Sequence, residues 1–180
     1  MKIISVAVGS ALCLGLGLWV SHASPAFAKT QVTANTIQEV DPQTAKDLLA
    51  TFEQAEQAMQ AQDLDGIMAL YSDDYYYHGL KKDDIRKVWM DLFDEYQDIA
   101  STHLLTKFNK VGSGSQTVLE VTCTGHLWAR SKTSGLYVPI DSWHEEVHYL
   151  VLEGGEWRIR GNLGDVPRLL PFGTSPHPLF

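Results

Sequence analysis

Residues Ser142 to Arg160 read SWHEEVHYLVLEGGEWRIR, two alternating runs of polar and apolar residues on either side of Gly154-Gly155. A Gly-Gly pair supplies the positive φ angles of a two-residue hairpin turn, and Val, Tyr, Trp and Ile favour strands. The stretch therefore predicts a β-hairpin. In it Glu153 faces Glu156, Leu152 faces Trp157 and Leu150 faces Ile159.

One face of this hairpin is apolar near the turn and polar at its far end. A strand period of two places these residues on it: His144, Glu146, His148, Leu150, Leu152, Trp157 and Ile159. This pattern is typical of a sheet face that is core at one end and lines a cavity at the other. Because histidine titrates near neutral pH, the polar end suits acid/base chemistry or the orientation of a polar ligand. Ordinary surface polar residues are the alternative.

The run His144-Glu145-Glu146-Val147-His148 also fits H-E-x-x-H, the signature of zinc proteases. On a helix the two histidines could share a zinc ion with Glu145 as general base. On a strand they lie four rises of roughly 3.3 Å apart, about 13 Å, too far to bind one ion. Pro139 and the Gly-Gly turn favour the strand. We therefore expect no metal site, with a small zinc metalloprotease as a remote alternative.

The first 28 residues carry Lys2, an apolar run from Ile3 to Val20 and then Ala26-Phe27-Ala28, the layout of a cleavable secretory signal. We expect cleavage after Ala28, a periplasmic or secreted protein and no membrane span after processing. A retained anchor is the alternative, because the apolar run is about long enough for a thin bilayer.

Charge and cysteine content narrow the classes of partner and chemistry. The formal net charge of −8 argues against nucleic acid as a partner. Cys123 is the one cysteine that remains after processing, which excludes an internal disulfide. We expect it to be a buried small apolar residue, with a catalytic nucleophile as the alternative.

Three amphipathic helices are predicted after a polar, flexible leader at residues 29–40. The first begins at Asp41-Pro42, which suit the cap and the first helical position, and ends near Gln62. The second runs from Asp63 through Tyr71 and the third from about Asp83 to Tyr96. A brief strand from Tyr75 to His78 separates them.

From Ile99 the period changes to two, which predicts long strands at Ile99–Val111 and Gln116–Arg130 before the hairpin. Helices followed by a strand meander indicate an α+β domain over residues 41–165, with three helices packed on one face of an antiparallel sheet. Its inner face is expected to include Leu119, Val121, Cys123 and Leu127. Prolines at 167, 171, 176 and 178 predict an irregular tail over residues 166–180.

The outer face of this sheet is expected to be more apolar than the surface of a monomer usually is. Its expected apolar members are Trp128, Trp143, Val147, Tyr149 and Val151. A homodimer through this face is one explanation, and cover by the C-terminal tail is the other.

The stretch Ala61 to Asp74, AQDLDGIMALYSDD, resembles the second-helix signature of the nuclear transport factor 2-like superfamily. This superfamily includes the SnoaL-like proteins and ketosteroid isomerase. The resemblance covers roughly residues 43–165 and is specific over Asp63–Asp74 and Trp157-Arg158-Ile159. It implies a strongly curved sheet wrapped around the helices, the cystatin-like cone, with a pocket at its open end.

The resemblance also bears on catalysis. Aligned on the second helix, the isomerase's general-base aspartate falls on Gly79 and its hydrogen-bonding tyrosine falls on Ala55, so both groups are missing. The position of its protonated aspartate falls on His148. Steroid isomerase activity is therefore not expected.

We expect the pocket to bind a small, partly apolar molecule without a cofactor. Its expected lining is Tyr75, Tyr77, Trp89, His144, Glu146 and His148. The alternative is a cone enzyme of the isomerase or dehydratase type, in which His148, His144 and Glu146 are the candidates for acid/base chemistry. The pattern leaves the faces of His78 and His103 open and does not name the ligand.

Overall fold

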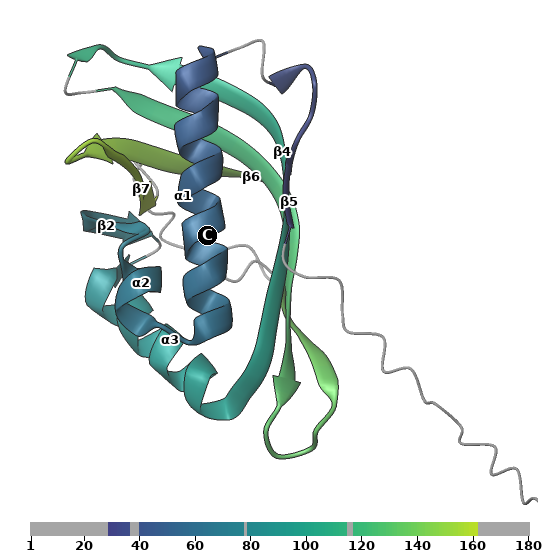
Figure 1. Ribbon diagram of the computed structural model, residues 1–180. Coiled ribbons are helices and arrows are strands. Elements are labelled where there is room, and N and C mark those ends of the chain that lie inside the picture. Colours follow the sequence, from purple (N-terminus) through teal and green to yellow (C-terminus); the bar gives the residue numbers. More distant parts are fainter. Residues whose placement is uncertain (1–28, 37–39, 78, 115–116, 162–180) are drawn as a thin grey trace, which may run out of the picture.

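The computed structural model describes residues 29–36, 40–77, 79–114 and 117–161. The expected signal, the tail and His78 lie outside the described residues. In chain order the elements are β1 (Lys29–Val32), α1 (Pro42–Ala61), α2 (Leu64–Met68), β2 (Tyr71–Tyr77), β3 (Leu80–Lys81), α3 (Lys82–Glu95), β4 (Tyr96–Val111), β5 (Val118–Ser131), β6 (Tyr137–Glu153) and β7 (Glu156–Gly161) (Figure 1).

The helices α1 and α2 begin where the sequence places their caps. Asp41 accepts a hydrogen bond from the Thr44 backbone N–H at 2.9 Å, and α1 ends where Gln62 adopts a left-handed φ of 54°. Asp63 caps α2 in the same way, through the Gly66 N–H. The predicted extent of α2 is wrong, since Tyr71 already begins β2.

The described strands form one mixed sheet in the order β1-β4-β5-β6-β7-β2-β3. The predicted meander from β4 to β7 is antiparallel, and the hairpin pairs are confirmed, with Leu150 opposite Ile159 and Leu152 opposite Trp157. The expectation of a wholly antiparallel sheet is wrong, because β1 runs parallel to β4 and β2 runs parallel to β7.

The segment expected to be a flexible leader is in part ordered. Lys29–Val32 forms β1 on the edge of β4, and the Thr30 hydroxyl donates to Glu56 Oε1 of α1 at 2.7 Å. A parallel strand of four residues is held by backbone hydrogen bonds, so it needs no side-chain periodicity that a sequence pattern could show.

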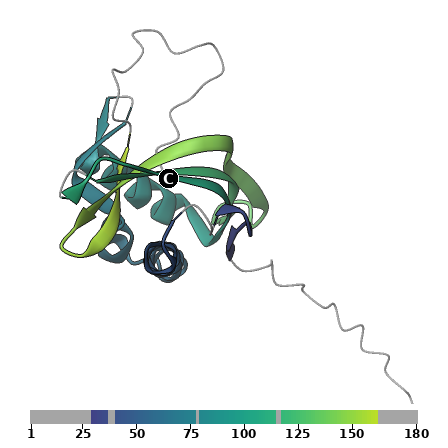
Figure 2. The same ribbon diagram turned by 90° about the horizontal axis from the view of Figure 1, so that it is seen from above.

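The sheet is curved, and α1 crosses one of its faces (Figures 1 and 2). The core joins fully buried residues of α1, such as Leu48, Phe52 and Met59, to the predicted inner residues of β5. These inner residues, Leu119, Val121, Cys123 and Leu127, are completely inaccessible to solvent. Among the described residues, no helix has both the length and the apolar character needed to cross a membrane.

Candidate functional site

A β-bulge interrupts β6 at Glu145. Cys123 pairs with Glu146 and Gly125 pairs with Trp143, so two residues of β6, His144 and Glu145, lie opposite Thr124 of β5. Glu145 has a φ of 52°, and its backbone N–H donates to Thr124 Oγ1 at 2.9 Å. One extra residue in a strand moves every side chain on one side of the bulge to the other face.

The bulge corrects two predicted faces. His144 was expected on the inner face with Glu146 and His148, but it is exposed. Trp143 was expected on the outer face, but only 4% of it is exposed. A regular period of two therefore fails across Glu145, and it holds from Glu146 to Leu150. Near the turn Leu152 is 54% exposed, so the predicted apolar end of this face is shorter than expected.

The strand interpretation of H-E-x-x-H is confirmed, because His144 to His148 lie within β6. His144 is exposed and His148 is buried, so the two imidazoles point to opposite faces. The described residues contain no group of three or more His, Cys, Asp or Glu side chains placed to hold a metal ion.

Tyr77 and Glu146 meet at the inner face of the sheet. The Tyr77 hydroxyl at the end of β2 donates to Glu146 Oε2 of β6 at 3.3 Å, and both side chains are half-buried. Burial, and then the neighbouring Glu146 carboxylate, raise the pKa of Tyr77 to about 12, so the hydroxyl keeps its proton at neutral pH. The contact brings together two of the predicted site residues.

His148 lies one alternate position further along the same face of β6, about 6.6 Å from Glu146 along the strand. It is 4% exposed and pairs with Val121, whose side chain is fully buried. The structure therefore places Tyr77, Glu146 and His148 along one inner surface. His144 lies outside this group.

Tyr75 and Trp89 are core residues that both contact Tyr71, the first residue of β2. Tyr75 packs edge-on against Tyr71, with ring centroids 5.3 Å apart, and Trp89 Nε1 donates to the Tyr71 hydroxyl at 3.0 Å. Burial raises the pKa of Tyr71 and Tyr75 well above the usual range, so both rings remain neutral. Their contact with a ligand stays a prediction.

A buried polar cluster around His103 was not found from the sequence. His103 Nε2 lies 3.1 Å from Ser101 Oγ, and its Nδ1 lies 3.8 Å from Cys123 Sγ. The imidazole packs between Phe52 and Trp143. Gly125 pairs with His103 and leaves the space that the Trp143 indole fills. A glycine inside a strand was the available signal, since it often marks such a close approach.

Cys123 belongs to this cluster as a protonated thiol. Trp143 Nε1 donates to its sulfur at 3.2 Å, and burial raises the pKa of the thiol to about 11. A nucleophilic cysteine requires the thiolate near neutral pH. The arrangement therefore fits the expected buried structural cysteine.

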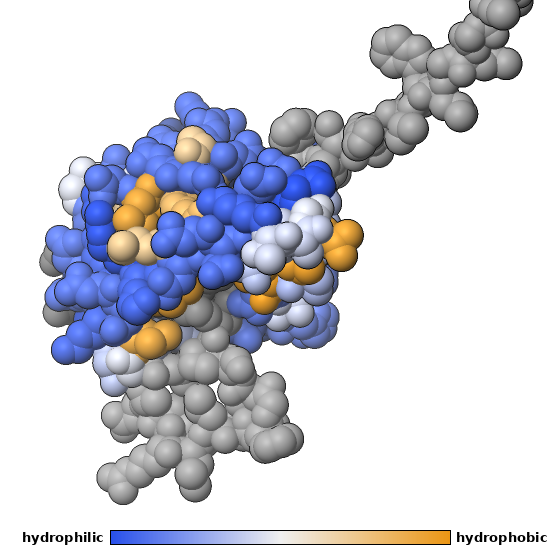
Figure 3. Space-filling view, turned by 90° about the horizontal axis from the view of Figure 1, so that it is seen from below, coloured by the Kyte–Doolittle hydropathy of each residue, from blue (hydrophilic) through white to orange (hydrophobic). Residues whose placement is uncertain are grey.

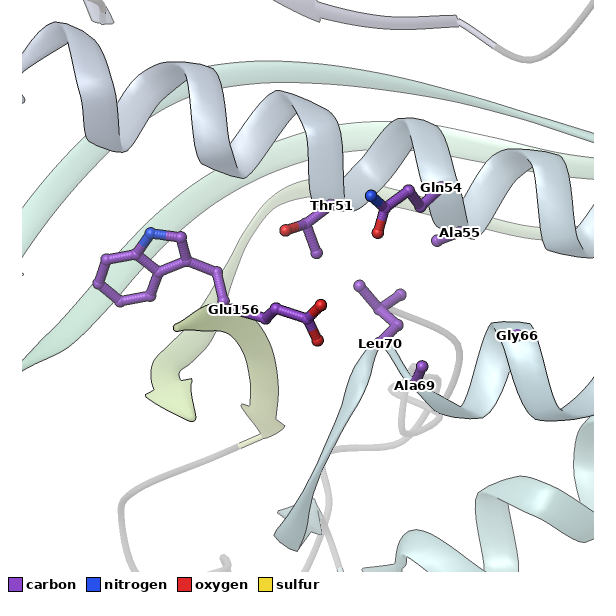
Figure 4. Close-up of a pocket in the computed structure, with 8 residues that line it drawn as sticks. Thr51, Gln54, Ala55, Gly66, Ala69, Leu70 and Glu156 are labelled. Atoms are coloured by element: carbon purple, nitrogen blue, oxygen red, sulfur yellow. The ribbon is translucent and has the colours of Figure 1, made fainter. Parts of the chain in front are cut away.

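A small cleft opens elsewhere, between α1, the end of α2 and the start of β7 (Figure 4). The Glu156 carboxylate points into it toward Thr51 and Leu70. Its lining is Thr51, Gln54, Ala55, Gly66, Ala69, Leu70, Glu156 and Trp157, and its volume is about 90 Å³. Sites for drug-sized ligands are roughly 300–1,000 Å³, so this cleft has room for only a few water molecules.

Comparison with known proteins supports the fold. No protein-family model and no curated protein matches the chain. Among solved structures, a conserved protein from Planctomyces limnophilus matches with a TM-score of 0.54 and 12% identity, over 67% of this chain and 94% of that chain. A ketosteroid isomerase-like protein from Erwinia carotovora atroseptica matches with a TM-score of 0.42 and 20% identity, over 62% and 87%.

Bd1075 of Bdellovibrio bacteriovorus matches with a TM-score of 0.44 and 17% identity over 66% of this chain. The match covers 40% of the length of that protein. At such identities a likeness concerns the fold alone. With three helices preceding a long meander in a curved sheet over the described residues, the chain has a nuclear transport factor 2-like fold.

Proposed function

We propose that the protein is exported and binds a small, partly apolar molecule where Tyr77, Glu146 and His148 lie. The observation that carries this proposal is the Tyr77–Glu146 hydrogen bond of 3.3 Å, next to a histidine that is 4% exposed. In this proposal the helices pack inside the curved sheet and leave a pocket at this end of the cone.

The physical basis is the position of these polar groups at the boundary of an apolar core. Ligand sites are mostly apolar surfaces with a few convergent polar groups that fix the orientation of the ligand. Tyr77 packs against the hydrophobic core, and Val121 opposite His148 belongs to that core. A ligand at this place would therefore meet apolar surface with a few polar partners.

Binding without chemistry is favoured over steroid isomerisation. Ala55, at the position that the resemblance gives to the isomerase's tyrosine, is buried in the core and carries no hydrogen-bond donor in its side chain. An acid/base enzyme of another type remains the alternative. His148 and Glu146 would be its candidate pair, because they share the inner face and His144 does not.

Native mass spectrometry of protein purified without a denaturation step tests the proposal, since a bound molecule adds a defined mass. The matched variants are His148→Ala, on the inner face, and His144→Ala, exposed on the same strand. We expect His148→Ala to weaken ligand binding by about 1 to 3 kcal/mol, the cost of removing one buried polar partner. His144→Ala should retain wild-type affinity. Equal losses, or a loss only in His144→Ala, would contradict the proposal.

For the outer face of the sheet we propose a homodimer contact. Its exposed apolar side chains include Leu104, Trp128 and Val147. The face seen in Figure 3, by comparison, is mostly hydrophilic, with its apolar side chains in separate groups. Sedimentation of wild type and Val147→Arg tests the contact. We expect the wild type to be a dimer and Val147→Arg to be a monomer, because the arginine places a charge in the contact. A monomeric wild type would favour the alternative that residues 166–180 cover the outer face.

A further inference from the structure

We infer that the ligand carries a hydrogen-bond donor, as an alcohol or a protonated amine does, and that carboxylic acids bind more weakly. This inference rests on the proposed function, because it concerns the same surface of Tyr77, Glu146 and His148. It adds the chemical class of the ligand.

The direction of the Tyr77–Glu146 hydrogen bond favours a donor on the ligand. An ionised carboxylate has acceptor sites and no donor, and a tyrosine hydroxyl has one proton. The Tyr77 proton is donated to Glu146 Oε2. The carboxylate of Glu146 has further acceptor lone pairs beyond the one that this bond uses. A ligand that meets the Glu146 carboxylate gains a hydrogen bond with it only if the ligand donates.

The charge of Glu146 favours the same class of ligand. Among the described residues, none of the five ion pairs includes Glu146. Its carboxylate is half-buried, so solvent screens it less than it screens a surface charge. A carboxylate on the ligand would meet a like charge there, which is strongly unfavourable, whereas an ammonium group would be attracted.

The sequence contains a matched control for the charge of Glu146. Glu145 and Glu146 are adjacent carboxylates on β6, but Glu145 is exposed at the bulge while Glu146 contacts Tyr77. Both can be changed to glutamine with the same loss of charge and almost no change in volume. A difference between the two variants then reports the position of the carboxylate rather than the net charge of the protein.

The experiment measures binding of benzyl alcohol, benzylamine and benzoate to the processed chain, by NMR chemical-shift titration. These probes share one ring and differ in the polar group. We expect the alcohol and the amine to bind at least about tenfold tighter than benzoate. Glu146→Gln should bring the benzylamine-to-benzoate ratio close to one, and Glu145→Gln should leave it unchanged. Circular dichroism checks that both variants fold.

Tyr77→Phe provides a second variant that keeps the Glu146 charge. It should retain discrimination against benzoate, because the charge of the Glu146 carboxylate is unchanged. The inference would be overturned if the wild type did not prefer the alcohol and the amine to benzoate. It would also be overturned if Tyr77→Phe lost this preference or Glu146→Gln kept it. If benzoate binds well and His148→Ala weakens it, the proposed function stands and only the ligand class is wrong. If none of the three probes binds, the inference is wrong, and the native mass spectrum alone decides whether the proposed function stands.

Discussion

His144 and His148 lie on opposite faces of β6, although residues four apart in a regular strand share a face. The cause is Glu145, whose φ of 52° and hydrogen bond to Thr124 Oγ1 insert one residue into the strand. The bulge turns Trp143 inward and His144 outward, and it separates the two halves of the zinc-protease motif.

Deleting Glu145 should destabilise the protein, because a regular strand would return Trp143 to the outer face. Loss of a buried indole from the core costs about 3 to 5 kcal/mol, which chemical denaturation measures as a lower midpoint. Glu145→Gly is the control, because glycine adopts a positive φ readily and keeps the bulge. A deletion variant as stable as wild type would show that the bulge does not position Trp143.

Gly125→Ala should cost at least about 2 kcal/mol of stability, since a Cβ there would collide with the Thr102 carbonyl oxygen and the Trp143 ring. The collision is steric, because Gly125 is not among the residues with positive φ. Thermal denaturation measures the loss. His126→Ala, at the exposed neighbouring position, should stay within about 0.5 kcal/mol of wild type. Equal effects at both positions would contradict the close approach of Trp143.

Cys123 should make the protein less stable in alkali. Its pKa rises from 9.0 to about 11 on burial, so the folded state holds the thiol proton more tightly than the unfolded state does. This contribution is complete below pH 9 and is lost as the pH rises through about 11. It amounts to about 2 to 3 kcal/mol.

The measurement is urea denaturation of wild type and Cys123→Ala between pH 8 and about 11. The alanine variant should lose less stability over this interval, because it lacks the titrating thiol. Val121→Ala, also fully buried on the same face of β5, should keep the wild-type slope. Identical slopes in wild type and Cys123→Ala would exclude the thiol as the titrating group.

The mature chain is expected to begin at Lys29, because Ala26-Phe27-Ala28 follows an apolar run. Sequencing the N-terminus of the exported protein checks this. The predicted cleavage site lies directly before β1, whose first residue is Lys29. A mature protein that retains Trp19 would refute cleavage at this site.

Local chemistry explains what the sequence predicts well. The Gly154-Gly155 turn set the register of Leu150 and Ile159, and the Asp41 cap set the start of α1. In each case the decisive groups lie within a few residues of one another. Such signals do not depend on the rest of the fold.

The sequence-based predictions that are wrong concern interactions between distant segments of the chain. The parallel pairing of β2 with β7 uses backbone groups that carry no side-chain pattern. The bulge at Glu145 depends on Thr124 of another strand, and no residue type near it requires a positive φ. Tyr77 and Glu146 were both predicted site residues. Their contact across 69 positions of sequence was not predicted, for the same reason.

The mixed sheet also has a consequence for the order of folding. Strands β4 to β7 each pair with a strand that is next to them in the sequence. Strand β2 pairs with the distant β7, where Tyr76 of β2 lies opposite Gly161 of β7. Closing a long loop costs more entropy than closing a turn, so non-local pairings form slowly. Pulsed hydrogen exchange during refolding should protect β5 before β2. Because β2 carries Tyr77, the surface shared with Glu146 would be among the last parts of the molecule to be assembled.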